Sequence, residues 1–591
     1  MHTTIDHIRW PDSRIAVSRL ASVIAGITLT LAVPILALGD RIELKDGRIL
    51  EGRFAPIGSV SKSAIDARGE RAGTGILMCD DGLTRTFVSR RLVDGIEEIP
   101  FELGYESFEL PQRIAESGRR ASAVGGILAV TPFDDRGRRI ISLGTTAGQI
   151  DIVQGITRIG ARTTHVAGLL TDRPVVIEMR LATSAIPTSE LLAMLRALGT
   201  DDDLQHRLRI VRMLVQSDRL DEAERELEEL IRDFPDRGDF QQQRDIVRRL
   251  LAEKIVSELS LRVKAGQPLL ALEMLESFPG DGLDGETLEL VRERRDAMLD
   301  QIERGRTLAD SIESHVESMP AGPEREQARR IAEDIRDGLS FISIDRLETF
   351  ERLTTEEDLP SSSAVALAMS GWLTGAGDSH DNLKLALSQR RVRDGIHDYL
   401  NAPDTASREA VYLQLVEEEA FDPRTVSRLV SAMRPPKAPP DPDATGIRRL
   451  EVSIPPSNEG GDDGRTCECL VMLPPEYDPL GRYPAIITLH ADFSTPTPQI
   501  DWWCGASNED GVRYGQAGRH GYIVIAPQWL EDGQSAYGYS AREHACVLAA
   551  LREACRHVAI DSDRVFLSGP SIGADAAWDI ALSHPDIWAG V

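Results

Sequence analysis

Cysteine and positive charge are both scarce in this sequence. Six cysteines stand among 591 residues, with no Cys-x-x-Cys pair and no Cys/His zinc spacing, which argues against a disulfide scaffold or a zinc site. Lys and Arg number 67 against 95 Asp and Glu, so the formal net charge is −28. Because such a surface repels phosphate groups, we expect no nucleic-acid partner and no binding to anionic membrane surfaces.

What is present is a long chain of ordinary globular composition. Hydrophobic residues make up 41% of it and charged residues 27%, which excludes wholesale disorder. At roughly 100–200 residues per domain, this length predicts three or four domains.

The first 39 residues have the pattern of an export signal. Three arginines precede an uncharged stretch from Leu20 to Gly39, and Ala37 and Gly39 are small residues at −3 and −1 before Asp40. We therefore expect cleavage near Gly39 and a periplasmic or extracellular protein. The alternative is an uncleaved membrane anchor, since the apolar stretch is just long enough to span a bilayer.

Three patterns follow one another along the next 400 residues. Residues 40–100 alternate with a period of two around turns such as Asp46-Gly47 and predict a small β module, and 101–187 predict a second β-rich module. From 188 to 433 the period becomes 3.6, which predicts an array of helices. We assign neither β module a chemistry.

The helical region weakly resembles tetratricopeptide-type helix pairs. The resemblance rests on the segments 216–223 and 264–275, whose alanines Ala223 and Ala271 lie 48 residues apart rather than 34, so the array is degenerate. Its charged runs are interpreted as solvated helix faces. A groove that binds a protein partner is the alternative, and no residue pattern identifies that partner.

A proline-rich linker at 434–446 precedes the last part of the chain, 447–591. Five prolines between Pro435 and Pro442 predict an extended, semi-rigid segment that separates the two parts. After it, strand patterns alternate with a helix pattern at 541–557, which predicts a mostly parallel, doubly wound α/β sheet. The expected strands are 449–454, 466–473, 485–489, 522–527 and 564–568.

The strongest chemical motif follows the last of these strands. Gly569-Pro570-Ser571-Ile572-Gly573 fits G-x-S-x-G and lies between a strand and a helix pattern at 574–583. Glycines at 569 and 573 permit a sharp turn and close packing, which would hold the Ser571 hydroxyl exposed at the end of the sheet. The alternative is a structural turn in a domain without activity.

Several segments of residues 446–591 resemble the α/β-hydrolase superfamily. Within it they are most similar to exported esterases and to prolyl-oligopeptidase-type peptidases. The resemblance implies Ser571 as nucleophile, and an oxyanion hole made by the backbone N–H of Ile572 with that of Ala491 or Asp492. Two residues depart from the pattern: Pro570 stands where relatives often have His, and Ala491 where they have Gly. The segments that carry the resemblance are 473–479, 482–484, 489–490, 563–569, 577–578 and 583–586.

An acid and a histidine that could complete a triad are missing from the pattern. In this superfamily both follow the serine, and here only twenty residues do. Asp575, Asp579, His584 and Asp586 lie on or just beyond the helix that Ser571 begins, so none is expected to reach its hydroxyl. We therefore expect an incomplete α/β-hydrolase domain whose acid and histidine lie in a missing C-terminal segment, and little turnover by this chain as it stands.

Other candidate residues have two interpretations each. Cys467 and Cys469 share one side of a strand and are interpreted as buried or edge thiols rather than a metal pair. His490 with Asp492 suggests either a metal site or, as we prefer, a loop that lines the active site. Aromatic residues in the loops after the strands would stack on a sugar, an aromatic group or a polymer, or would pack against the domain: Trp502, Trp503, Trp529, Tyr537 and Tyr539.

The sequence thus predicts an exported serine hydrolase that cleaves ester bonds, or peptide bonds, through an acyl-enzyme at Ser571. Ester cleavage is favoured because no β-propeller precedes the last domain. No metal or organic cofactor is implied. The alternative is a scaffold or binding protein that uses the helical array and carries a degenerate hydrolase-like domain.

Overall fold

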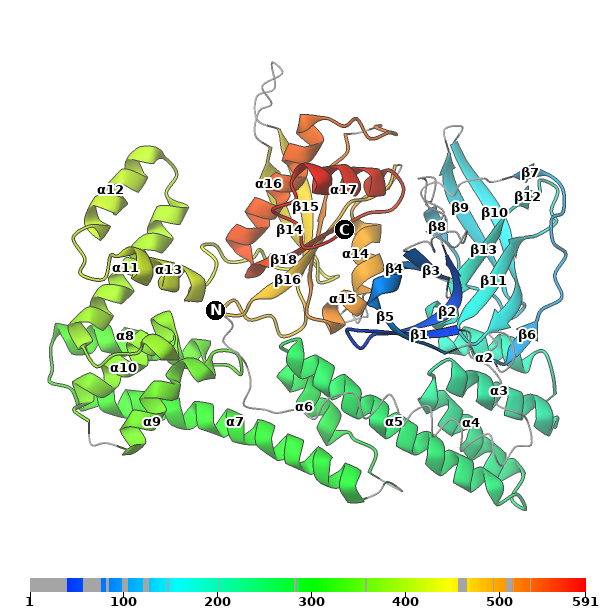
Figure 1. Cartoon of the computed structure of the whole chain (residues 1–591), viewed down its shortest axis with the longest axis horizontal. Coiled ribbons are helices and arrows are strands. Elements are labelled where there is room, and N and C mark those ends of the chain that lie inside the picture. The colour runs from blue at the N-terminus through cyan, green and yellow to red at the C-terminus, as the bar shows by residue number, and fades with distance from the viewer. Residues whose placement is uncertain are drawn as a thin grey trace, which may run out of the picture. The chain divides into compact units, whose positions relative to one another are not determined.

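The structure is a computed structural model of the whole chain (Figure 1). It describes residues 40–56, 76–80, 84–97, 105–120, 127–145, 148–200, 202–280, 283, 285–356, 359–454, 465–492, 494–505, 507, 513, 515–531 and 533–591. The expected export signal, residues 1–39, lies outside the described residues. The chain divides into two units, residues 1–254 with 280–284, and residues 255–279 with 285–591.

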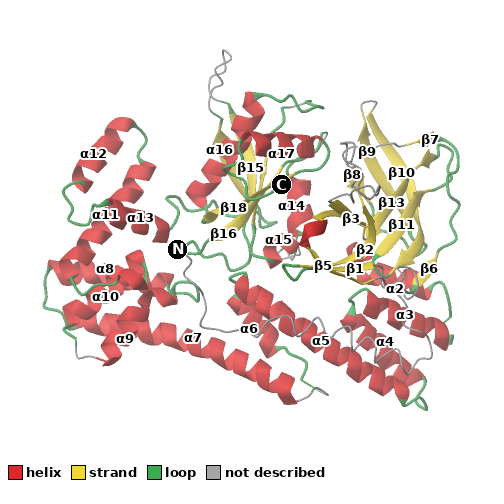
Figure 2. Ribbon diagram, viewed as in Figure 1, coloured by secondary structure: helices red, strands yellow, loops and turns green. Residues whose placement is uncertain are grey.

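The first unit combines two antiparallel sheets with helices (Figure 2). One sheet has the order β4-β3-β2-β1-β5, and Ile42, Leu44, Leu77 and Val88 form its core. Its strands are β1 (Asp40–Leu44), β2 (Ile49–Pro56), β3 (Ile76–Asp80), β4 (Arg85–Ser89) and β5 (Val93–Glu97). A described antiparallel sheet therefore lies in the region where the sequence predicts the first β module.

The second sheet has the order β13-β11-β10-β9-β8, with β6 paired to β10. A separate short parallel pair joins β7 to β12. The strands are β6 (Ser107–Glu109), β7 (Arg119–Arg120), β8 (Ile127–Val130), β9 (Arg138–Thr145), β10 (Gly148–Gly160), β11 (Thr163–Gly168), β12 (Val175–Val176) and β13 (Glu178–Ala182).

Helices begin at Thr188, where the period of the sequence changes. Asp203 caps the second of them by accepting hydrogen bonds from the backbone N–H groups of Gln205 and His206. Arg219 donates to the carbonyls of Thr183 and Ile186 and so ties the helices to the end of β13. The helices are α2 (Thr188–Arg196), α3 (Leu204–Gln216), α4 (Leu220–Asp233) and α5 (Asp239–Lys264), which continues into the second unit.

Among the described residues, the helical part of the second unit has three apolar cores. The largest lies around α10 (Ser361–Thr374), where ten consecutive residues from Ala364 to Leu373 are buried. Such a helix is apolar on every side because other helices surround it. The remaining helices are α6 (Pro268–Glu276), α7 (Gly285–Glu317), α8 (Pro323–Gly338), α9 (Glu348–Glu356), α11 (Leu383–Asn401), α12 (Thr405–Leu415) and α13 (Pro423–Ala432).

The proline-rich segment after α13 makes contacts at several points along its length. The backbone N–H of Lys437 donates to the carbonyl of Arg556 at 2.9 Å, and the Lys437 ammonium lies 3.1 Å from the Glu553 carboxylate. Asn401 of α11 donates to the carbonyl of Pro436 at 2.8 Å. The segment therefore contacts α11 on one side and α16 (Ala541–His557) on the other, and does not behave as a free spacer.

The last part of the second unit is a five-stranded mixed sheet with the order β14-β15-β17-β16-β18. β14 and β15 are antiparallel, whereas β16 is parallel to both β17 and β18. The strands are β14 (Arg448–Ser453), β15 (Thr466–Met472), β16 (Tyr483–Thr488), β17 (Ile523–Pro527) and β18 (Ile560–Ser568). Every residue of β16 and β17 is buried, as their continuous apolar sequences predict.

Helices cover both faces of this sheet. Ile523 and Ile525 point to the face under α16 and α17 (Ile572–Ser583), while Val524 and Ala526 point to the face under α14 (Thr497–Cys504) and α15 (Gln516–Arg519). The alternation follows from the two-residue period of a strand. This arrangement places the end of β18, and the start of α17, at the carboxyl edge of the parallel strands.

No helix in the described ranges is long and apolar enough to cross a bilayer.

Candidate active site at the β18–α17 turn

Ser571 occupies a strained turn between β18 and α17. Its backbone has φ 53° and ψ −126°, and only three other described non-glycine residues have a positive φ. A residue with a Cβ adopts this conformation at a cost of roughly 1–3 kcal/mol, so the surrounding structure must impose it. The backbone therefore turns sharply between strand and helix at the position of the motif.

The two glycines of the motif explain how the turn closes. A Cβ on Gly573 would lie 2.5 Å from the carbonyl oxygen of Leu489, and one on Gly569 would lie 2.6 Å from the backbone of Gly573. Both contacts are with backbone atoms, which cannot move aside as a flexible side chain can. The turn therefore packs directly against the end of β16, and the residues that follow Leu489 lie beside Ser571.

The hydroxyl of Ser571 is left free for chemistry. A serine before a helix ordinarily caps it, but Ser571 makes no side-chain cap hydrogen bond and is exposed. Its carbonyl accepts from the backbone N–H of Ala574, whereas the N–H of Ile572 has no acceptor among the described residues. An unpaired N–H at a helix N-terminus favours negative charge, as an oxyanion requires.

The residues after β16 differ in part from the prediction. Ala491 is buried beside the turn and Asp492 is half-buried. His490 was expected to line a substrate path, but it is 1% exposed, its Nδ1 lies 2.9 Å from the Ala491 carbonyl, and Nε2 has no described partner. Burial lowers the pKa of His490, so the ring is held neutral inside the protein.

The tryptophans also differ from the prediction. Trp529 is fully buried in the core under α16 and α17, and its indole N–H donates to the His490 carbonyl at 3.1 Å. It therefore fixes the strand ends and is not placed to line a substrate path. Trp502 and Trp503 lie in α14 and not in a loop: Trp502 is 81% exposed, while Trp503 packs partly on the core beneath that helix.

No described acid or histidine is bonded to Ser571. Asp579 lies eight residues along α17, about 12 Å from Ser571 at the rise of an α-helix. Its carboxylate accepts from the Tyr537 hydroxyl at 2.7 Å and lies 2.9 Å from His544 Nε2 of α16. These hydrogen bonds, the Tyr537 one first, lower the pKa of Asp579.

His584 follows the last residue of α17 and lies beside His544, with its Nε2 3.5 Å from His544 Nδ1. As the helical spacing predicts, Asp579 and His584 are engaged away from the nucleophile. His544 was missed by the sequence analysis, because nothing in the pattern of α16 distinguishes it from an exposed helical residue.

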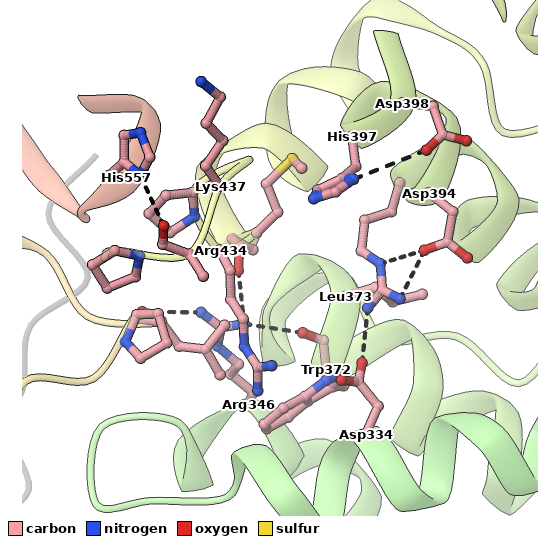
Figure 3. Close-up of a pocket in the computed structure, with 18 residues that line it drawn as sticks. Asp334, Arg346, Trp372, Leu373, Asp394, His397, Asp398, Arg434, Lys437 and His557 are labelled. Carbon is pink, nitrogen blue, oxygen red and sulfur yellow. Dashed lines mark hydrogen bonds and ion pairs between the residues drawn. The ribbon is translucent and has the colours of Figure 1, made fainter. Parts of the chain in front are cut away.

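A cavity lies at the opposite edge of the sheet from Ser571, and Figure 3 shows the residues that line it. It has a volume of about 590 Å³. Leu480 stands just before β16 and His557 just before β18, so the cavity is at the amino ends of the parallel strands. Ser571 follows the carboxyl end of β18. No serine, threonine or cysteine is among the described residues that line the cavity, so it offers no hydroxyl or thiol nucleophile.

Two cations of this cavity, Arg346 and Arg393, already have protein partners. Arg346 donates to the carbonyls of Trp372 and Ala432, in the last turns of α10 and α13, at 3.2 and 3.0 Å. The ends of helices carry negative partial charge, which a guanidinium stabilises. Burial lowers the pKa of Arg346. Arg393 contacts Asp334 and Asp394 (Figure 3). We interpret this cavity as a packing feature of the helices.

Comparison with known proteins gives a weak resemblance over part of the chain. No protein-family model and no curated protein matches the sequence. Similar solved structures include the S-formylglutathione hydrolase FrmB of Staphylococcus aureus, with 16% identity over 24% of this chain and 58% of that one, at a TM-score of 0.18.

The CE1 ferulic acid esterase AmCE1/Fae1A of Anaeromyces mucronatus has 15% identity over 24% of this chain and 54% of that one, at a TM-score of 0.18. The S-formylglutathione hydrolase of Agrobacterium tumefaciens has 16% identity over 25% and 57%, also at a TM-score of 0.18. The chain spans somewhat more than half the length of these three proteins. The resemblance to hydrolases therefore stays weak and partial.

Proposed function

We propose that this chain carries the nucleophile of a serine hydrolase that cleaves ester bonds, or peptide bonds, through an acyl-enzyme. The observation that supports the proposal is the strained backbone of Ser571, whose exposed hydroxyl caps no helix. Strain of this kind persists where the surrounding structure imposes it, and it concentrates at active sites.

In the proposed reaction the Ser571 oxygen attacks the substrate carbonyl while a histidine removes the hydroxyl proton. The N–H of Ile572, with that of Ala491 or Asp492, donates to the oxyanion. The alcohol or amine leaves with the proton, and water then releases the acyl group by the same route. No step uses a metal or an organic cofactor.

We further propose that the acid and the histidine follow Val591 in the complete protein. The support is spatial: Asp579, His544 and His584 contact one another beside α17 and do not contact Ser571, and among the described residues the outer edge of β18 pairs with the backbone of Ala589 and Gly590. Reading the coding region past codon 591 tests this. An open frame with an acid and a later histidine is expected, and a stop codon there would contradict it.

Covalent labelling with a fluorophosphonate tests the nucleophile. We expect one label per chain on the complete protein, and its loss in Ser571→Ala, because only an activated serine attacks phosphorus at a useful rate. Ser583→Ala is the matched control, since Ser583 is an exposed serine at the other end of α17. It should label as the wild type does. A folded complete protein that takes no label would contradict the proposal.

The second candidate function is a scaffold that binds a protein through its helices. The exposed apolar side chains of Tyr412, Leu413 and Val416, at the end of α12, favour it.

Export to the periplasm or the exterior, with cleavage near Gly39, belongs to both proposals. N-terminal sequencing of the mature protein tests it, and a first residue at Asp40 is the expected result.

A further inference from the structure

Two cysteines from distant parts of the sequence meet between the sheet and a helix. Cys467 is the second residue of β15 and Cys546 lies in the second turn of α16, 79 residues later. Their sulfur atoms are 3.2 Å apart, and both thiols are free. A disulfide needs about 2.05 Å, so the sulfurs would have to approach by only about 1.2 Å.

We propose that Cys467 and Cys546 form a disulfide that links β15 to α16 when the protein meets a disulfide oxidant. The oxidant belongs to the chemical class of small or protein disulfides. This inference is independent of the proposed hydrolase activity, because neither cysteine lies at the β18–α17 turn.

The surroundings of the pair assign each cysteine a role. Cys467 is half-buried, so an oxidant can reach it, whereas Cys546 is fully buried. The hydrogen bond from the Cys546 thiol, followed by the charge of Arg542, lowers the pKa of Cys467. The same hydrogen bond, together with burial, raises the pKa of Cys546. Cys467 is therefore the attacking thiolate and Cys546 the thiol that follows.

The reaction balances in two exchange steps. The Cys467 thiolate attacks one sulfur of the oxidant, the oxidant's S–S bond breaks, and one thiolate leaves and takes a proton. Cys546 then loses its proton and attacks the Cys467 sulfur, releasing the second thiol. Two protein thiols are oxidised by two electrons, and one external disulfide is reduced to two thiols.

The neighbouring cysteine supplies a matched control. Cys469 lies two residues along β15 on the same side of the strand, is 0% exposed, and has no other cysteine sulfur within bonding distance among the described residues. Burial raises the pKa of Cys469, which disfavours its thiolate. Cys469→Ser should therefore leave the oxidation unchanged.

The test is a count of thiols on the purified chain before and after treatment with oxidised glutathione. All variants carry Cys555→Ser, since Cys555 is exposed. In this background we expect two thiols to disappear without bound glutathione, and a peptide pair joined through Cys467 and Cys546 to appear in non-reducing mass spectrometry. The melting temperature should rise by a few degrees, because the cross-link closes a long loop.

Single substitutions separate the two roles. Cys546→Ser should trap one glutathione on Cys467, because the second step is blocked. Cys467→Ser should bind none, because Cys546 is buried. Far-ultraviolet circular dichroism shows whether each variant is folded. Full retention of all thiols in the wild type, or a cross-link that involves Cys469, would overturn the proposal.

Discussion

At the scale of single residues, Ser571 is one of four described non-glycine residues whose backbone has a positive φ. The motif predicted the turn because its two glycines, which permit a sharp turn and close packing, lie between a strand pattern and a helix pattern. The buried positions of His490 and Trp529 could not be predicted. The sequence predicts that residues after a parallel strand lie at the carboxyl edge of the sheet, but it does not predict whether their side chains point into the core.

The strain at Ser571 predicts an unusual mutational effect. Ser571→Gly should raise the free energy of unfolding by about 1 kcal/mol, because glycine adopts a positive φ without a clash. Ser583→Gly, in the regular last turn of the same helix, should lower it by about 0.5–1 kcal/mol. Urea denaturation of both variants measures the difference. Equal effects at the two positions would show that the turn at 571 is unstrained.

At the scale of elements, α16 was predicted best, and it spans Ala541–His557 as expected. Its start is encoded locally: Ser540 accepts from the N–H of Glu543, whose carboxylate accepts from the N–H of Ser540. β18 was predicted too short, because its first residue, Ile560, pairs with Tyr483 across the sheet and such pairing leaves no local signal in the sequence. The Cys467–Cys546 and Asp579–His544 contacts could not be predicted either, because contacts between residues far apart in the sequence leave no local signal.

The capping carboxylate predicts a pH dependence of stability. Burial alone would raise the pKa of Glu543, but hydrogen bonds from the N–H groups of Ser540 and Gly538 outweigh it and hold the pKa below its usual value. Because the pKa of Glu543 is lower in the folded protein than in the unfolded chain, its ionisation stabilises the fold at pH values above the unfolded pKa, near 4.3. This stabilisation is lost as the pH falls through the folded pKa. Glu543→Gln should therefore cost about 1–2 kcal/mol at pH 7 and progressively less below pH 4.

Unfolding curves of Glu543→Gln between pH 3 and 7 measure this dependence. Glu409→Gln, which changes an exposed carboxylate on α12, is the control and should alter the free energy of unfolding by less than about 0.5 kcal/mol. A cost at Glu543 that stays constant across the pH range would contradict the assignment.

At the scale of the whole molecule, the second unit unites two parts that the sequence pattern separates. Glu476, before β16, accepts hydrogen bonds from the N–H groups of Leu269 and Leu270 at 2.9 and 2.7 Å and so caps α6. Gln267 donates to the carbonyl of Gly518 at 2.6 Å. These contacts join residues more than 200 positions apart and leave no local pattern in the sequence. The proline-rich linker was therefore the only visible signal, and it suggested two independent parts.

The tertiary cap predicts that helices and sheet are energetically coupled. Glu476→Gln should lower the free energy of unfolding of the second unit by about 1 kcal/mol, because it replaces one of the two accepting oxygens with an NH2 group that cannot accept from a backbone N–H. Glu273→Gln, an exposed change on α6, is the matched control. Hydrogen exchange should show reduced protection in both α6 and β17. Loss confined to α6 would mean that the two parts open independently.

The strand order also determines how long β16 waits for its neighbouring strands during synthesis. β16 leaves the ribosome before both of its sheet neighbours, and β18 is complete only roughly 80 residues later. At about 5–20 residues per second, this apolar strand waits for roughly 4–16 s without its second partner. Each nascent chain thus exposes an apolar strand for seconds, which makes β16 a natural binding segment for a chaperone that holds the growing polypeptide.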